Sequence, residues 1–142
     1  MRSEIYEFNP RVAVAPQVVT GSSPVVSGII DTLGYNALSF VVVTGTLSST
    51  AATFAVSLEH GDAANLSDTA AVTGDDLAGT LANAAFNYSA DNSARKVGYL
   101  GSKRYVRCTV TPTNNSSDSN AALAVVALLD DATSMPTPAV PT

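Results

Sequence analysis

The stretch Thr53-Phe54-Ala55-Val56-Ser57-Leu58-Glu59-His60 decides the fold class of this 142-residue chain. Its apolar side chains Phe54, Val56 and Leu58 alternate with small or polar ones. A period of two residues is typical of a β-strand with one face buried and one face open. The segment Tyr105–Thr111 alternates in the same way. Both segments therefore predict strands that turn one side toward a common core.

Further strands are expected where apolar or β-branched segments lie between clusters of Gly, Asn, Asp or Pro. These segments are Val12–Thr20, Val25–Ile30, Phe40–Val43, Ala85–Tyr88, Val97–Leu100 and Ala122–Leu129. The continuous apolar run Phe40–Val43 favours a central strand that is covered on both faces. The link Gly101-Ser102-Lys103 predicts a short hairpin connection. Eight or so short strands predict an all-β, single-domain antiparallel β-sandwich of the jelly-roll type.

Two segments allow more than one structure. The segment Asp62–Ala84 is rich in Ala, Asp and Thr, and we expect a long excursion with a short helix around Asp75–Leu81. The Ala and Leu content of Ala121–Ala132 is compatible with a helix. We favour a strand there because the β-branched Val125 and Val126 lie at its centre.

Both ends of the chain are expected to lie outside the sandwich. The expected layout is an N-terminal arm at 1–10, the β-sandwich domain at 11–132 and a Pro-rich C-terminal arm at 133–142. The proline spacing of Met135–Thr142 favours extended polyproline II geometry. Two interpretations stay open, frayed termini or arms that lie across a neighbouring subunit. The apolar residues that would make such contacts are Tyr6, Phe8, Met135 and Val140.

Composition excludes several classes of protein. Charged residues make up 13% of the chain and aromatic residues 6%, with no Trp, whereas enzymes bring charged and titratable groups together in a cleft. The net charge of −5 argues against a nucleic-acid partner. The first residues lack the apolar stretch of a signal peptide, and no apolar run is long enough to span a membrane. We therefore expect synthesis in the cytoplasm and no membrane partner.

No catalytic, cofactor-binding or metal-binding residue is predicted. The single histidine, His60, ends a strand, and no Gly-x-Ser-x-Gly elbow accompanies it. The single cysteine, Cys108, excludes an internal disulfide and lies on the inward face of its strand, where a thiol acts as a small hydrophobe. Neither Asp75-Asp76 nor Asp130-Asp131 forms a carboxylate pair alone, because neighbouring strand residues point to opposite faces.

Charge is segregated along the chain. The basic residues between positions 95 and 107 are Arg95, Lys96, Lys103, Arg104 and Arg107. The acids between positions 59 and 91, where no Lys or Arg occurs, are Glu59, Asp62, Asp68, Asp75, Asp76 and Asp91. If 95–107 is a hairpin, it presents a positive patch. That patch either pairs with the acidic excursion of the same chain or docks on an acidic partner.

One run of residues is specific enough to suggest a family, namely Gly98-Tyr99-Leu100-Gly101-Ser102-Lys103-Arg104-Tyr105-Val106-Arg107. With the acidic excursion before it and the apolar strand after it, the region from Asn36 to Asp130 resembles the cement (decoration) proteins of tailed-phage capsids. The resemblance implies a jelly-roll protein without catalytic residues. It also implies a dimer or other homo-oligomer that clamps neighbouring major capsid protein subunits.

The sequence thus predicts a non-enzymatic virion protein on the outer capsid surface, with the major capsid protein and further copies of itself as partners. The interface residues expected are Tyr6, Phe8, Lys103, Arg104, Arg107, Met135 and Val140. Two alternatives stay open. One is a carbohydrate-binding adhesion module on the virion, against which the absence of Trp counts. The other is a tail or head-completion component.

Overall fold

Six long strands carry the fold in a computed structural model, which describes residues 4–134. They are β1 (Asn9–Val19), β4 (Tyr35–Leu47), β5 (Thr53–Gly61), β9 (Ala94–Tyr99), β10 (Tyr105–Thr113) and β11 (Ala121–Ala132). Short elements complete them: β2 (Val25–Val26), β3 (Ile30–Asp31), β6 (Ala70–Ala71), the 3-10 turn η1 (Gly74–Asp76), β7 (Leu77–Ala78), α1 (Leu81–Ala84) and β8 (Phe86–Asn87). β1 begins before residue 11, where the sequence places the start of the sandwich.

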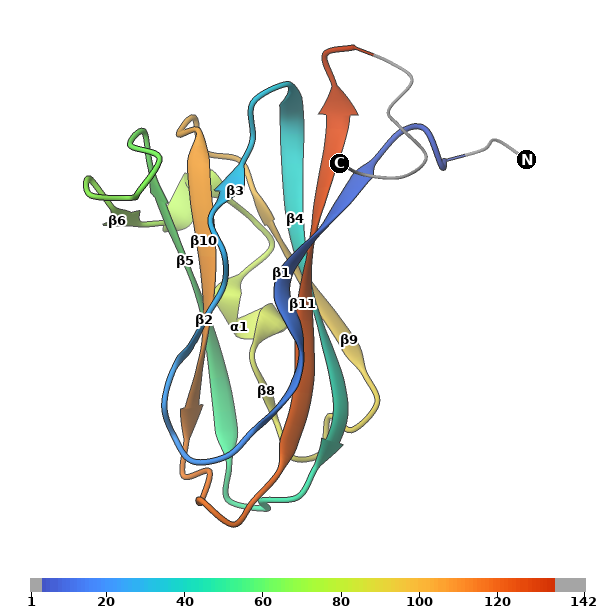
Figure 1. Cartoon of the computed structure of the whole chain (residues 1–142), viewed down its shortest axis with the longest axis vertical. Coiled ribbons are helices and arrows are strands. Elements are labelled where there is room, and N and C mark those ends of the chain that lie inside the picture. The colour runs from blue at the N-terminus through green and yellow to red at the C-terminus, as the bar shows by residue number, and fades with distance from the viewer. Residues whose placement is uncertain (1–3, 135–142) are drawn as a thin grey trace.

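The strands form two antiparallel sheets that pack face to face (Figure 1). The first sheet has the order β1-β11-β4-β9-β7, and the second has the order β2-β10-β5-β6. β3 also pairs with β10, and β8 pairs with β5. The predicted all-β sandwich is therefore confirmed. The first described residues and the end of β11 lie at the same end of the sandwich.

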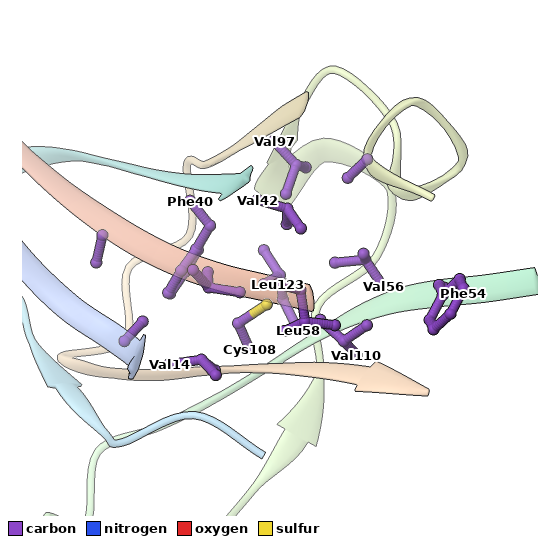
Figure 2. Close-up of a cluster of buried hydrophobic side chains, with 14 of the residues drawn as sticks. Val14, Phe40, Val42, Phe54, Val56, Leu58, Val97, Cys108, Val110 and Leu123 are labelled. Carbon is purple, nitrogen blue, oxygen red and sulfur yellow. The ribbon is translucent and has the colours of Figure 1, made fainter. Parts of the chain in front are cut away.

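The core lies between the sheets and is built from the inward side chains that alternation predicts (Figure 2). Phe40 and Val42 of β4 and Cys108 of β10 have no exposed surface. Phe54 of β5 stacks on Phe86 of β8 with ring centroids 4.6 Å apart, which holds β8 against β5. Burying one such side chain contributes about 1.5–3 kcal/mol, so these two layers supply most of the folding energy.

β11 is a strand, as favoured, because it lies between β1 and β4 and bonds to both along its length. The expected helix around Asp75–Leu81 is wrong in detail. A 3-10 turn is followed there by β7, which pairs with β9, and α1 begins only at Leu81. Thr80 explains that start, because its side chain accepts a hydrogen bond of 3.1 Å from the Asn83 N–H and so caps the helix. α1 then covers the gap between β5 and β9.

The expected strand Val25–Ile30 is divided into β2 and β3. Its middle changes partner: Ser27 exchanges hydrogen bonds with Cys108 of β10, and the Gly28 N–H donates to the Ala13 carbonyl of β1. A segment that bonds alternately to the two sheets cannot continue as one strand. The expected strand Ala85–Tyr88 shortens to β8 because its next residues enter a turn, which Asn87 closes with its side chain.

The hairpin predicted at Gly101-Ser102-Lys103 does not exist. β9 pairs with β4 in the first sheet, whereas β10 pairs with β5 in the second sheet. The three residues therefore carry the chain from one layer to the other. As a result, Arg95 and Lys96 do not share a sheet with Arg107, and the predicted single positive face of residues 95–107 is wrong.

Phe40–Val43 does belong to a central strand, since β4 lies between β11 and β9. The expectation that both of its faces are covered is wrong. Phe40 and Val42 are fully buried, but Val43 is 42% exposed because no part of residues 4–134 covers it on the outer side of the first sheet. The outer side of β4 is therefore exposed over part of its length.

Candidate functional site

The outer side of the first sheet, here called the open face, is apolar over three adjacent strands. Its side chains are those that alternate with the core residues of β1, β11 and β4: Val12, Val18, Ala122, Ala124, Val126, Leu128, Ala37, Ser39, Val41 and Val43. The register places Val126 between Val12 on one neighbour and Val41 on the other. Val12 is 68% exposed and Val18 59%, so the surface is open to a partner.

The open face contains a depression at one end, between β1, β11 and β4. β1 carries two irregularities, between Val12 and Val14 and between Val14 and Gln17, and these bend it away from a regular ladder. The resulting depression of about 510 Å³ is lined mainly by apolar groups, among them Pro16, Val18, Val43, Gly45, Ala122 and Ala124. A Cβ on Gly45 would lie only 3.0 Å from the Ala122 Cβ, so glycine keeps the floor low there. The depression can accept an apolar side chain from another protein.

The size of the open face bears on what it can do. With strands about 4.8 Å apart and a rise of about 3.3 Å per residue, three strands over seven positions cover roughly 300 Å² in projection. The largest contiguous apolar patch on a typical folded monomer is about 300–600 Å² and is often functional, and the open face lies at the lower end of that range. A standard protein–protein interface needs about 800 Å² from each partner, so this face is the centre of a contact and requires additional contacts around it.

The basic residues named as interface candidates are engaged within the chain. Arg104 pairs with both carboxylate oxygens of Asp31 at 2.8 Å, and its guanidinium lies over the Tyr105 ring. The Lys103 ammonium bonds to Asp62, and Arg107 pairs with Glu59, which lies opposite it in the register of β10 and β5. The side-chain hydrogen bond from Arg104 lowers the pKa of Asp31. Lys103, Arg104 and Arg107 therefore each form an ion pair within the chain. These contacts agree with the interpretation in which the basic residues pair internally.

The Gly98–Arg107 run has a structural explanation centred on Tyr99. The Tyr99 hydroxyl oxygen accepts the Lys103 N–H at 2.9 Å, and it forms a hydrogen bond of 3.0 Å with His60 Nδ1 across the two sheets. The ring lies so close to Gly101 that a Cβ there would approach the hydroxyl oxygen to 2.5 Å. Burial raises the pKa of Tyr99. The run therefore shapes the crossover between the layers.

The other expected interface residues lie at the two ends of the chain. Tyr6 is 47% exposed and lies in a turn before β1. Phe8 is half-buried and interacts with other residues. Met135 and Val140 lie outside the described residues. Of the expected residues that the structure describes, none belongs to the open face.

The titratable groups in the core have structural partners. His60 is 9% exposed and packs edge-on against Tyr99, so it joins the sheets instead of merely ending a strand. Within residues 4–134, no three side chains from His, Cys, Asp and Glu gather as metal ligands. No helix in that range has the length and apolar character to cross a membrane.

Cys108 is expected to resist modification while the protein is folded. Burial raises the pKa of its thiol to about 12, and the thiolate is the reactive form. Iodoacetamide at pH 8 should leave Cys108 intact in the native protein and label it fully in denaturant, as intact-mass spectrometry would record. Rapid labelling under native conditions would contradict the buried position.

Comparison with protein-family models and with curated proteins finds no match to this chain. The open face also has a signal in the sequence. Phe40–Val43 and Ala121–Leu129 are apolar at almost every position, which predicts two covered faces. Within residues 4–134 the two-layer fold covers only one of these faces, so the second apolar face stays exposed.

Proposed function

We propose that this protein is a structural component of a phage virion that binds the outside of the capsid and clamps neighbouring major capsid protein subunits. The observation that carries the proposal is the open face, an apolar surface on a rigid central sheet. The Gly98–Arg107 run and its resemblance to cement proteins point to the capsid as the partner. The same resemblance makes a homodimer or another homo-oligomer part of the proposal.

The strand order supports the jelly-roll type. A jelly roll arises when four nested antiparallel pairs wind together, the outermost joining the first and last strands. Here β1 pairs with β11, β2 with β10, β4 with β9, and β5 with β6. These pairs are nested in the chain in that way, with β7 added at the edge of the first sheet.

A clamp of this kind stabilises a shell by linkage, because a subunit that binds only the assembled state shifts the equilibrium toward it. The open face alone is smaller than a standard interface, so stable attachment requires several contacts that act together. Such contacts between neighbouring subunits do not need a catalytic cleft. They need a rigid surface with few charges, which fits the 13% charged content.

Labelling of intact particles tests the proposal. An epitope tag on the protein, detected by gold-conjugated antibody on particles from the encoding genome, should decorate the whole shell. Label at a single vertex or along the tail would contradict cement and favour a head-completion or tail component. Absence of the protein from purified particles would contradict the proposal. Clear hits on a glycan array would favour the alternative of a carbohydrate-binding adhesion module on the virion.

A further inference from the structure

One side of β9 is only partly paired. In the first sheet β9 has β4 on one side and β7 on the other, and it lies at the right margin of the sandwich in Figure 1. β7 pairs with Tyr99 and Gly98 of β9 and goes no further. Gly79, at a φ of +86°, then turns the chain away toward α1. Within residues 4–134, Ala94–Val97 therefore have no neighbouring strand on that side, here called the β9 edge.

The hydrogen-bond pattern shows which peptide groups face the β9 edge. In an antiparallel sheet, the N–H and C=O groups of successive residues point alternately to the two sides of the strand. The Thr44 N–H of β4 donates to the Ser93 carbonyl at 2.9 Å, in line with the register of β4 and β9. Counting from Ser93, the N–H and C=O groups of Ala94 and Lys96 face away from β4. These groups are the donors and acceptors that the β9 edge offers to another strand.

A hollow lies beside the β9 edge. Its volume is about 550 Å³, and its lining includes Ser39, Gly79, Asn83, Lys96 and Gly98. Gly79 and Asn83 belong to the segment that turns away after β7, so the hollow lies where a longer β7 would continue. At a rise of about 3.3 Å per residue, the β9 edge is about 13 Å long. It therefore suits an added strand of about four residues.

The opposite edge of the first sheet is protected against strand addition. β1 forms that edge, and it carries Pro10, Pro16 and two irregularities in its register. Prolines and bulges are devices that keep an edge strand from pairing with another chain. β9 has no proline, and its register with β4 is regular over Ala94–Tyr99. The charge of Lys96 is the protective device that remains, and a charge repels only partners of its own sign.

The charges of β9 favour an acidic segment over a second copy of this chain. Within residues 4–134, neither Lys96 nor Arg95 lies within ion-pair distance of an acidic side chain. Two copies that paired their β9 edges antiparallel over most of Ala94–Val97 would place Lys96 opposite Lys96, or Arg95 opposite Arg95. Like charges directly opposite each other destabilise a pair of strands, whereas opposite charges stabilise it.

The β9 edge also adjoins the open face. Lys96 lies opposite Val41 in the register of β9 and β4, and Val41 is one of the open-face side chains. The side chains of Ala94 and Lys96 are exposed, whereas Val97 points into the core. A protein that covers the open face can therefore reach the β9 edge with a neighbouring part of its chain.

We propose that the β9 edge binds an extended acidic segment of the protein that covers the open face, and that this segment adds to the first sheet as a short strand in line with β7. The inference rests on the proposed function for that protein being a capsid subunit. Backbone hydrogen bonds to Ala94 and Lys96 hold the segment, and an Asp or Glu opposite Lys96 selects it. The added strand supplies the contact outside the open face that stable attachment requires.

The first test uses the isolated protein and a peptide, read out by NMR. The peptide is acetylated and amidated Thr-Glu-Thr-Val-Thr, whose glutamate lies opposite Lys96 when the peptide runs antiparallel to β9 from Val97. Titration should shift the amide signals of Ala94 and Lys96 in a saturable way. The control peptide with lysine in place of glutamate should bind about fivefold more weakly. Shifts that do not saturate, or equal binding of the two peptides, would overturn the proposal.

The second test uses particles made without the subunit and two variants at one position. Lys96→Thr and Lys96→Pro both remove the charge, but only proline removes the N–H that faces the β9 edge. In co-sedimentation Lys96→Thr should bind about threefold more weakly than the wild type, and Lys96→Pro about tenfold more weakly than Lys96→Thr. Hydrogen exchange of the wild type needs no variant. On particles, exchange at the amides of Ala94 and Lys96 should slow by about tenfold or more.

The outcomes separate the two proposals. If the wild type binds particles but exchange at Ala94 and Lys96 is unchanged, or if the proline and threonine variants bind equally well, strand addition at the β9 edge is wrong and the capsid function stands. If the wild type does not bind particles, the capsid function is wrong. The peptide titration then still decides whether the β9 edge accepts an acidic strand.

Discussion

Replacing Val43 with aspartate is expected to weaken attachment to the capsid by about a hundredfold, because an unpaired carboxylate in an apolar interface costs several kcal/mol. Val43 lies in the open face opposite Ala124 and lines its depression. Its side chain is 42% exposed in the isolated protein, so the carboxylate stays hydrated there. The fold should therefore lose at most about 1 kcal/mol of stability. Quantitative co-sedimentation with particles that lack the subunit measures the effect.

Val26→Asp is the matched control. Val26 is 53% exposed and also lies on a strand, but its strand, β2, belongs to the second sheet. Both variants introduce the same charge and the same loss of β-branching. Both variants should have a thermal midpoint close to that of the wild type. If Val43→Asp and Val26→Asp then bind particles equally well, the open face does not contact the capsid.

The strands were predictable wherever one face is buried against the other sheet. Alternation at Thr53–His60 and Tyr105–Thr111 indicates both the strands and their inward residues, and β5 and β10 match it position by position. Pairing was less predictable, because a short connection can join neighbours in one sheet or cross between sheets. The crossover at Gly101 is stabilised by the buried Tyr99 side chain, which forms hydrogen bonds with His60 of the other sheet and with Lys103. Those contacts are invisible in a local pattern.

The candidate site was less predictable than the fold. The charge of Arg104 and Arg107 is conspicuous in the sequence, but their partners Asp31 and Glu59 become evident only once β3, β5 and β10 are paired. Asp31 is 73 residues from Arg104 in the chain, so no local pattern connects them. Conversely, Arg95 and Lys96 looked like part of the same patch, and only the crossover separates them. Local charge density therefore grouped cations that the fold places in two different sheets.

Tyr99→Phe is expected to lower the free energy of unfolding by about 2 kcal/mol, because it leaves buried donors and acceptors without a partner. The lost hydroxyl serves the Lys103 N–H and carbonyl and His60 Nδ1 together. For a chain of this size the thermal midpoint should fall by roughly 4–8 °C. Tyr105→Phe is the control, since its hydroxyl forms no hydrogen bond within residues 4–134. Calorimetry that finds the two variants equally stable would contradict the role assigned to Tyr99.

A double-mutant cycle separates the ring of Tyr99 from its hydroxyl. Gly101→Ala places a Cβ about 2.6 Å from ring carbons of Tyr99, so in the wild type it should cost about 1–3 kcal/mol by overpacking. In a Tyr99→Leu background the ring is absent, and most of that cost should disappear. The two substitutions should therefore couple by about 1 kcal/mol or more. Additive effects would mean that Gly101 is required by its own backbone and not by the ring, and the spacing of glycine and tyrosine in the Gly98–Arg107 run would need another cause.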